Sequence, residues 1–310
     1  MGDALISAKS RTPMLVTQND QLLLCGAFPP SLEDMVASVT KSRTTTSSLL
    51  RTSVKSYPYH AIVLARQLSD TIAGDYARLA PLSETAVFNF LSSLSSMNYV
   101  VHVLFNPVDT TARNRFVLDD ASRLCVFRCV FGFTGLVLPF YRELVHRETS
   151  DGLAQSPRAY ERLQFMRAQA RDMAIMGAHL LARAIRYLPK IHYAPAQWNS
   201  IYGWVEFCAE EVDSGAQLYP EFMQDLETLA NELKFMGYML QAASEPHYIA
   251  LVKRLEGHAN LASIDISSQL DFFLETAWMG RSRLMLTSRE SLRADAQSVS
   301  PTILSFTVFL

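Results

Sequence analysis

The sequence predicts an all-α protein made of two packed helical lobes with extended N- and C-terminal arms. Apolar residues recur at helical spacing through the middle of the chain, and 49% of the 310 residues are hydrophobic, enough for a large core. Prolines and polar segments separate the helical stretches. We expect an N-terminal arm and basic linker at 1–56, an N-terminal lobe at 57–150, a C-terminal lobe at 151–280 and a C-terminal arm at 281–310.

The longest predicted helix begins after Ser156 and runs to Leu188. Ser156 is a favourable N-cap, and Pro157 suits the first helical position, where its missing N–H costs nothing. One face of this helix is apolar throughout: Leu163, Met166, Ala170, Met173, Ala174, Gly177, Leu181, Ala184 and Leu188. The small residues of this stripe, Ala170, Ala174 and Gly177, would let another helix approach closely.

The N-terminal lobe and the segment before it read as further helices. Ser31, followed by Glu33 and Asp34, predicts the start of a short helix, and Ser83 is a candidate N-cap for another. The expected helices start at Ser31 and span 59–79, about 83–105 and about 119–138. Pro139 is expected to separate the last of these from a segment at 140–146.

The C-terminal lobe should begin a new helix at Pro195, whose exposed face would be acidic through Glu206, Glu210 and Glu211. Further helices are expected at 219–243, 246–259 and 264–278. The N-terminal arm suggests a hairpin near Asn19, and the chain ends in an apolar, strand-like run. Both apolar arms would either fold back on the same subunit or pack on neighbouring copies.

Arginine dominates the basic residues, because only six of the 28 are lysine. Arginine suits phosphate recognition and buried ion pairs, but a GC-rich genome would produce the same bias. The net charge of −2 carries no global basic signature. Locally, no acidic residue lies between Met35 and Ser69, which makes the linker a positive segment. Two interpretations stay open for all these arginines: a solvated basic face, or a surface that contacts anions or nucleic acid.

Motifs of catalysis and metal binding are missing from the sequence. It has no Gly-rich phosphate cradle, no nucleophile elbow and no pair of histidines at zinc-ligand spacing. The four cysteines form no disulfide framework, no signal peptide is evident, and the most apolar run, 124–140, is interrupted by Arg128. We therefore expect no catalytic residues, no metal, no cofactor and no membrane partner.

An aromatic cluster follows the longest helix: Tyr193, Trp198, Tyr202 and Trp204. Such residues either bury themselves in the core or stack on the bases of a single strand.

Part of this segment, Pro195-Ala-Gln-Trp198 followed by Trp204-Val-Glu206-Phe207, resembles the core of flexuous filamentous virus coat proteins. The resemblance extends to all-helical viral nucleoproteins, and it implies exchanged terminal arms and RNA held against arginines between two lobes. The Ala- and Leu-rich helices with scattered aromatics also resemble the regulatory region of fungal zinc-cluster transcription factors. The six-cysteine DNA-binding cluster of those factors is absent.

The leading hypothesis is a self-assembling viral nucleocapsid or coat protein, found in the virion and host cytoplasm. It would bind the RNA backbone without sequence preference, and its partners would be RNA and further copies of itself. The candidate RNA-binding residues are Arg43, Arg51 and Lys55 on the linker, Arg113 and Arg115 beyond it, and Arg158, Arg162, Arg167, Arg171, Arg183 and Arg186 on the longest helix.

Three alternatives remain. A protein–protein regulatory module would be an intracellular soluble protein with a groove for a partner or a small ligand. A capsid shell subunit would assemble through its arms without touching RNA. An enzyme built from distant residues ranks third and would bind a small molecule saturably.

Overall fold

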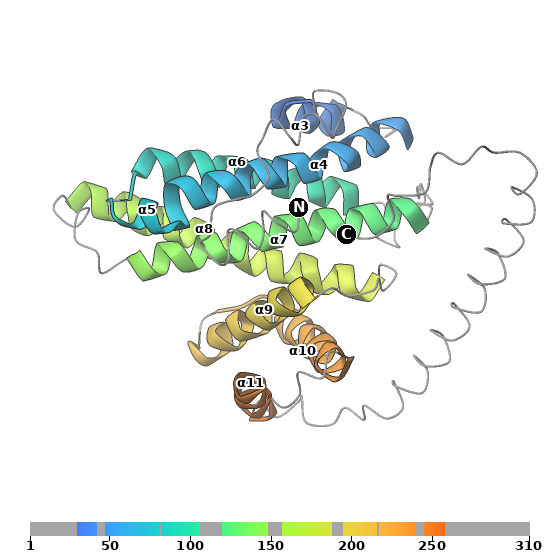
Figure 1. The fold of residues 1–310 in the computed structure, drawn as a ribbon, viewed down its shortest axis with the longest axis vertical. Helices are drawn as coiled ribbons and strands as arrows, with labels where there is room; N and C mark the ends of the chain where they lie inside the picture. The colour runs from blue at the N-terminus through green and yellow to red at the C-terminus, as the bar shows by residue number, and fades with distance from the viewer. Residues whose placement is uncertain are drawn as a thin grey trace, which may run out of the picture. The chain divides into compact units, whose positions relative to one another are not determined.

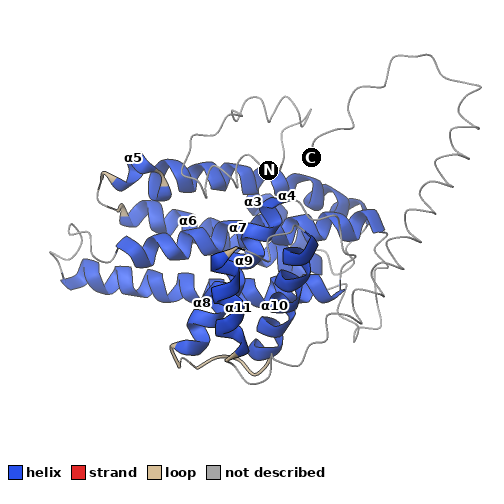
Figure 2. Cartoon of the chain, turned by 60° about the horizontal axis from the view of Figure 1, so that its bottom comes forward, coloured by secondary structure: helices blue, strands red, loops and turns tan. Residues whose placement is uncertain are grey.

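The computed structural model confirms the all-α prediction. It describes residues 30–41, 47–80, 82–105, 120–147, 157–187, 195–215, 217–239 and 245–257, and within these ranges every regular element is a helix (Figures 1 and 2). The chain divides into two compact units, Met1–Val252 and Lys253–Leu310. All packing and site geometry below concerns the first unit.

The described helices follow one another along the chain. They are α3 (Leu32–Lys41), α4 (Ser47–Leu68), the π-helix η1 (Ser69–Ala73), α5 (Asp75–Arg78), α6 (Glu84–Phe105), α7 (Asp120–His146), α8 (Pro157–Tyr187), α9 (Pro195–Asp213), α10 (Phe222–Met239) and α11 (Pro246–Glu256).

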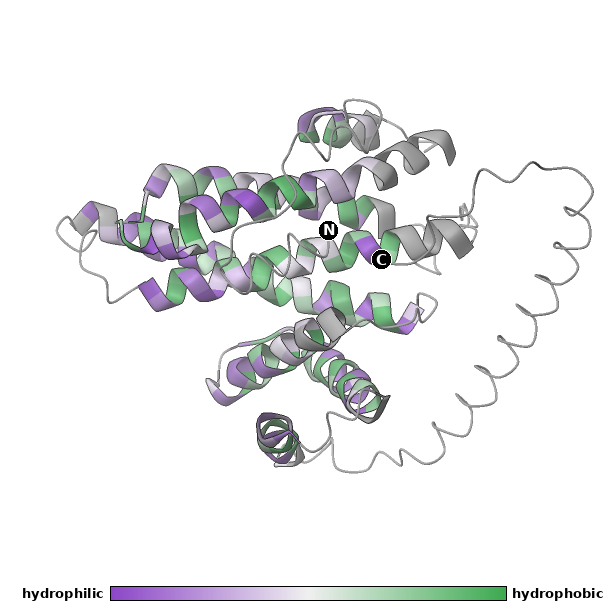
Figure 3. Cartoon of the chain, in the orientation of Figure 1, coloured by the Kyte–Doolittle hydropathy of each residue, from purple (hydrophilic) through white to green (hydrophobic). Residues whose placement is uncertain are grey.

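Helix α7 lies at the centre of the core. It packs most extensively against α8 and α4 and also contacts α6, and these helices run side by side in Figure 1. Phe127, Phe133 and Phe140 are almost completely buried along it. Because burying a large apolar side chain contributes about 1.5–3 kcal/mol, this helix supplies much of the driving force for folding. Figure 3 shows hydrophobic residues along the faces that α6, α7 and α8 turn toward one another.

Helix α8 matches the sequence prediction closely. It begins at Pro157, and every described member of the predicted apolar stripe, from Leu163 to Ala184, is buried. The predicted close approach also occurs, because a Cβ built on Gly177 would lie 3.0 Å from Cη2 of Trp204 on α9. Ser156 and Leu188 fall outside the described residues.

The predicted N-cap at Ser83 and the predicted helix start at Ser31 are confirmed. The Ser31 hydroxyl accepts a hydrogen bond from the backbone N–H of Asp34 at 3.0 Å, at the start of α3. The Ser83 hydroxyl accepts one from the N–H of Ala86 at 3.3 Å, at the start of α6. Each cap supplies a partner for one of the N–H groups that the first helical turn leaves unpaired.

One predicted helix start and one predicted helix break are wrong. Helix α4 begins at Ser47 and not at residue 59, and Pro58 lies inside it, so Arg51 and Lys55 are helical residues and not part of an extended linker. Pro139 lies inside α7, which continues to His146. A proline removes one helical hydrogen bond, but the fully buried Tyr57 and the buried Phe140 show that core packing carries both helices past the interruption.

The expected helix at 59–79 is also corrected, because α4 ends at Leu68 and one turn of π-helix follows. The turn closes when the N–H of Gly74 donates to the carbonyl of Ser69 at 2.8 Å. A Cβ on Gly74 would lie only 2.2 Å from that carbonyl oxygen. Glycine is therefore required here by space, and the chain then turns into the short helix α5.

Other predictions lie outside the described residues: the hairpin near Asn19, the helix at 264–278 and the strand-like C-terminal run. The boundaries between arms and lobes stay predictions. Within the part that the structure describes, no helix combines the length and the apolar character that crossing a bilayer requires.

Candidate functional site

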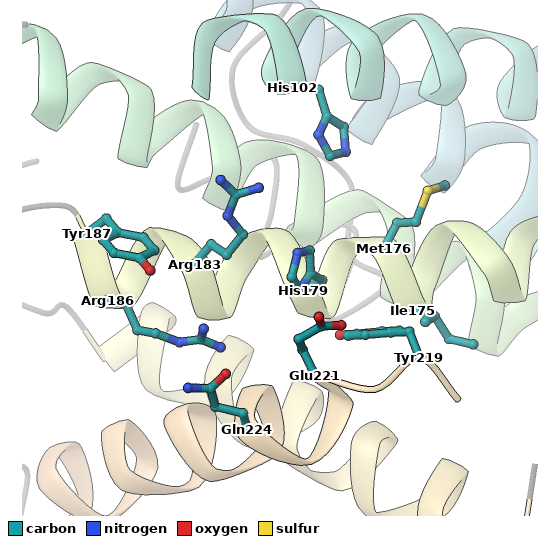
Figure 4. A pocket seen from close by; sticks show the side chains of 10 residues that line it. All are labelled: His102, Ile175, Met176, His179, Arg183, Arg186, Tyr187, Tyr219, Glu221 and Gln224. Carbon is teal, nitrogen blue, oxygen red and sulfur yellow. The ribbon is translucent and has the colours of Figure 1, made fainter. Parts of the chain in front are cut away.

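The described helices enclose a half-open pocket of about 570 Å³ beside α8 (Figure 4). Helix α6 contributes His102, α10 contributes Gln224, and the segment before α10 contributes Tyr219 and Glu221. The remaining lining residues come from α8: Ile175, Met176, His179, Arg183, Arg186 and Tyr187.

One face of α8 therefore forms the floor of the pocket. Met176, His179, Arg183 and Arg186 recur every three or four residues, which places them on the same side of the helix. Ile175 and Met176 make one end of this face apolar, whereas Arg183 and Arg186 make the other end basic. At a rise of about 1.5 Å per residue, the two ends lie roughly 10–15 Å apart.

Asp225 of α10 binds three of the side chains that line the pocket. Its side chain is fully buried, and three groups donate hydrogen bonds to its carboxylate. Nδ1 of His179 lies 2.6 Å from Oδ2, the Tyr219 hydroxyl lies 2.5 Å from the same oxygen, and Nη2 of Arg186 contacts Oδ1. Nε of Arg186 also donates to Thr228 at 2.9 Å. A buried carboxylate is stable only with such partners, so Asp225 holds three pocket side chains in fixed positions.

The two histidines of the pocket face each other from different helices. Figure 4 shows the imidazole of His102 above and that of His179 below, with Arg183 beside them. Burial lowers the pKa of both imidazoles, and the positive charge of Arg183 lowers each pKa further. Burial is the larger cause of these shifts, and Arg183 adds positive charge to the space beside both histidines.

Burial also raises the pKa of Tyr219 well above its ordinary value, so its hydroxyl keeps the proton that it donates to Asp225. Glu221 is exposed at the rim of the pocket, and its carboxylate is the only one among the described residues that line the pocket. The pocket thus combines a positive centre, an acidic rim and an apolar end.

Several of the candidate RNA-binding arginines on α8 face carboxylates of this protein. Arg162 donates to Glu84 at 2.8 Å, and Nε of Arg171 donates to Glu211 at 3.0 Å. Arg186 pairs with Asp225 as described. These pairs join α8 to α6, α9 and α10 respectively, so one role of the arginines is to connect helices.

The remaining α8 arginines occupy three different environments. Arg167 is 7% exposed, and its Nε donates to the backbone carbonyl of Leu144 at 3.0 Å. Arg183 lines the pocket. Arg158 is exposed and makes no ion pair within the described residues.

Of the other candidates, Arg51 and Lys55 lie on α4, and Arg43, Arg113 and Arg115 lie outside the described residues. Contact between any of these residues and RNA stays a prediction.

The expected acidic surface of α9 is only partly exposed. Glu210 is exposed, but Glu211 is buried against Arg171, and Glu206 accepts a hydrogen bond from Arg142 at 2.6 Å. The prediction was wrong for Glu211, because its partner on α8 cannot be identified from the α9 sequence, whereas Glu206 is half-exposed. Trp204 is fully buried, in agreement with the core interpretation of the aromatic cluster for that residue.

The sequence pattern did not reveal the pocket. The seven histidines are scattered along the sequence, and no motif marks Tyr219, Glu221, Gln224 or Asp225. One signal was present: His179, Arg183 and Arg186 share a helix face. No pattern within α8, however, shows that His102 and Asp225 lie opposite that face.

No group of three or more His, Cys, Asp or Glu side chains that could bind a metal ion occurs among the described residues. Comparisons of the chain with protein-family models, with curated proteins and with solved structures find no match.

Proposed function

We propose that this protein is a helical binding module that recognises a small organic anion in the pocket between α6, α8 and α10. The observation that carries the proposal is the positive centre of the pocket, where Arg183 and the two facing histidines come together. Ligand pockets in proteins combine an apolar wall with a few well-placed polar groups. This pocket has that combination along one face of α8.

Two arginines, Arg183 and Arg186, line the basic end of the pocket, and their positive charge supports an anionic ligand. Asp225 and Thr228 hold Arg186, so its guanidinium helps to shape the wall of the pocket. Arg183 lies one turn earlier and contributes positive charge to the space between His102 and His179. An anion placed there would interact favourably with Arg183 and would reduce the repulsion between that arginine and protonated histidines.

The apolar end suggests the rest of the ligand. Ile175 and Met176 lie about two turns from Arg183 on the same face, so a ligand whose anionic group contacts Arg183 can place an apolar portion on them. A groove for a small ligand is also what the regulatory-module hypothesis requires.

Isothermal titration calorimetry with hexyl phosphate tests the proposal. We expect one site per chain, and Arg183→Gln should weaken binding at least about tenfold, because a hydrogen bond to a charged group contributes about 1.5–3 kcal/mol. Arg158→Gln is the matched control, since Arg158 is exposed on the same helix outside the pocket. Equal affinities of the two variants, or no binding at millimolar ligand, would contradict the proposal. Turnover of the ligand would favour the enzyme alternative.

Encapsidation of RNA remains the second candidate function. The observation that favours it is the N-terminal end of α8, where Arg158 is exposed and the Arg162–Glu84 pair is accessible to solvent. An exposed ion pair contributes about 0–1 kcal/mol, so a phosphate could replace the carboxylate at little cost.

The RNA candidate predicts binding of single-stranded RNA that weakens steeply with salt. The double variant Arg162→Glu, Arg183→Glu should reduce that binding, with circular dichroism confirming that the helices are intact. RNA binding equal to that of the unsubstituted protein, together with purified material free of nucleic acid, would exclude it. A capsid shell subunit would instead assemble into particles without nucleic acid.

A further inference from the structure

The hydrogen bond between His179 and Asp225 determines which nitrogen of the imidazole carries a proton. A carboxylate only accepts hydrogen bonds, so the Nδ1 atom that lies 2.6 Å from Asp225 must carry the hydrogen. In a neutral imidazole the other nitrogen, Nε2, is then an acceptor. Asp225 thus presents His179 to the pocket as an acceptor.

The acceptor is open to the pocket. Within the described residues, Nε2 of His179 makes no hydrogen bond, and the ring lines the pocket and points toward His102 (Figure 4). The Tyr219 hydroxyl cannot donate to it, because that hydroxyl donates to Asp225 at 2.5 Å. A bound ligand is therefore the natural donor for this nitrogen.

Building on the proposed function, we propose that the anionic group of the ligand is a phosphate monoester that shares a proton with Nε2 of His179. A phosphate monoester has a second pKa of about 6, so near neutral pH it exists partly as a monoanion with one P–O–H group. That O–H would donate to Nε2, while the other oxygens accept from Arg183. A sulfate ester or a carboxylate carries no proton in this range, and its oxygens would lie against an acceptor.

The charged groups around His179 support this assignment. Arg183 and Arg186 lie on its own helix, and His102 faces it from α6. Asp225 contacts it from α10, and Glu221 lines the pocket from the segment before α10. Burial and the two arginines lower the pKa of His179, and Glu221 only partly opposes them. Near pH 7 the imidazole is consequently the neutral acceptor that the proposal needs.

The proton balance gives a measurable signature. When the phosphate monoanion binds, the proton arrives with the ligand, and none is taken from solvent. When the dianion binds at higher pH, the complex takes up one proton per site. A sulfate ester has no proton to bring, so its binding should improve only as His179 itself becomes protonated.

The experiment compares hexyl phosphate with hexyl sulfate by calorimetry at pH 6.5, in two buffers of different ionisation enthalpy. We expect phosphate to bind at least about tenfold tighter, the factor that corresponds to one hydrogen bond to a charged group. Proton uptake should approach one per site at pH 8 and fall toward zero below pH 6. As the pH falls and His179 becomes protonated, the preference for phosphate should shrink.

Two variants separate the role of His179 from general effects. His179→Phe removes the acceptor and should bring the affinity ratio of the two ligands close to one. His102→Phe should weaken both ligands and leave the preference for phosphate in place. Both folds are checked by circular dichroism, and the ratio and proton uptake of the unsubstituted protein test the proposal without either variant.

The outcomes distinguish this inference from the proposed function. Equal binding of both ligands at pH 6.5, or phosphate binding without proton uptake at pH 8, would overturn the phosphate assignment and leave the anion pocket standing. Absence of binding by both ligands would overturn the proposed function itself.

Discussion

Gly177 of α8 lies directly against the indole ring of Trp204 of α9, and the missing side chain makes this contact possible. A Cβ at Gly177 would lie 3.0 Å from Cη2 of Trp204, and Trp204 is fully buried. The ring has little room to move, because Phe207 packs edge-on against it at a centroid distance of 5.7 Å. The two helices can therefore approach each other closely only if position 177 is small.

Gly177→Val should lower the free energy of unfolding by about 1–3 kcal/mol, the usual cost of overpacking a core. Gly203→Ala on α9 is the control, because its Cβ would meet Leu138 at 3.4 Å and Arg142 at 3.9 Å, both ordinary contacts, and alanine favours the helix. Chemical denaturation followed by circular dichroism measures both. A valine at 177 that is tolerated as well as the alanine at 203 would show that α9 can shift away from α8.

Gly74→Ala should disrupt the π-helical turn at 69–73. The new Cβ would lie 2.2 Å from the backbone oxygen of Ser69, and a backbone atom cannot move aside as a side-chain tip can. We expect a loss of at least about 2 kcal/mol in the free energy of unfolding and faster amide exchange in α5.

Asp70→Ala tests whether the Gly74 effect is specific. Asp70 is exposed in the same π-helical turn and pairs with Arg66 on the surface, so its loss should cost less than about 1 kcal/mol. Similar destabilisation by both substitutions would mean that any change in this turn is harmful and that the Cβ clash is not the cause.

Removing one partner of the Arg171–Glu211 pair should destabilise the fold. The Glu211 side chain is 8% exposed and that of Arg171 is 32% exposed, so the carboxylate would be left buried without its main partner. We expect Arg171→Gln to lower the free energy of unfolding by about 1–3 kcal/mol. Arg158→Gln should change it by less than about 0.5 kcal/mol, since Arg158 is exposed. Equal stability of the two variants would show that the pair contributes nothing.

Acid should destabilise the protein already between pH 7.5 and pH 5.5. Burial lowers the pKa of His60, His102 and His179 below the ordinary value of 6.5 in the folded state. The unfolded chain therefore binds more protons than the folded protein as the pH falls through about 6.5. The free energy of unfolding consequently falls as the pH is lowered through this range. Above about pH 7.5 both states are neutral at these positions, and the effect disappears.

Thermal unfolding across this pH range measures the effect. Substituting His102 by Asn should flatten the pH profile, whereas His247→Asn, at an exposed position of α11, should leave it unchanged. A stability that is independent of pH between 7.5 and 5.5 would contradict the lowered histidine pKa values.

The sequence predicted those parts of the fold that depend on local patterns. The stripe of α8, the helix start at Ser31 and the cap at Ser83 follow from helical spacing and from the hydrogen-bonding ability of a serine hydroxyl. The helix start at residue 59 and the break at Pro139 were wrong because a proline penalty is local, whereas the burial of Tyr57 and Phe140 depends on distant helices.

The site was harder to predict because its residues come from separate helices. The arginines of α8 were recognised, but the carboxylates that face them, such as Glu84 and Glu211, are far away in the sequence. Periodicity shows which residues share a face of one helix and not which helix lies opposite. His102 and Asp225 could therefore not be assigned to the pocket before the fold was known.

The network around Asp225 also constrains how the sequence can change during evolution. His179, Arg186 and Tyr219 all donate to one fully buried carboxylate, so losing Asp225 alone would leave a half-buried guanidinium and a half-buried hydroxyl without this acceptor. Losing one donor would in turn weaken the compensation of the carboxylate. Related chains should therefore retain or replace these four residues as a group, and their joint variation would identify the pocket from an alignment alone.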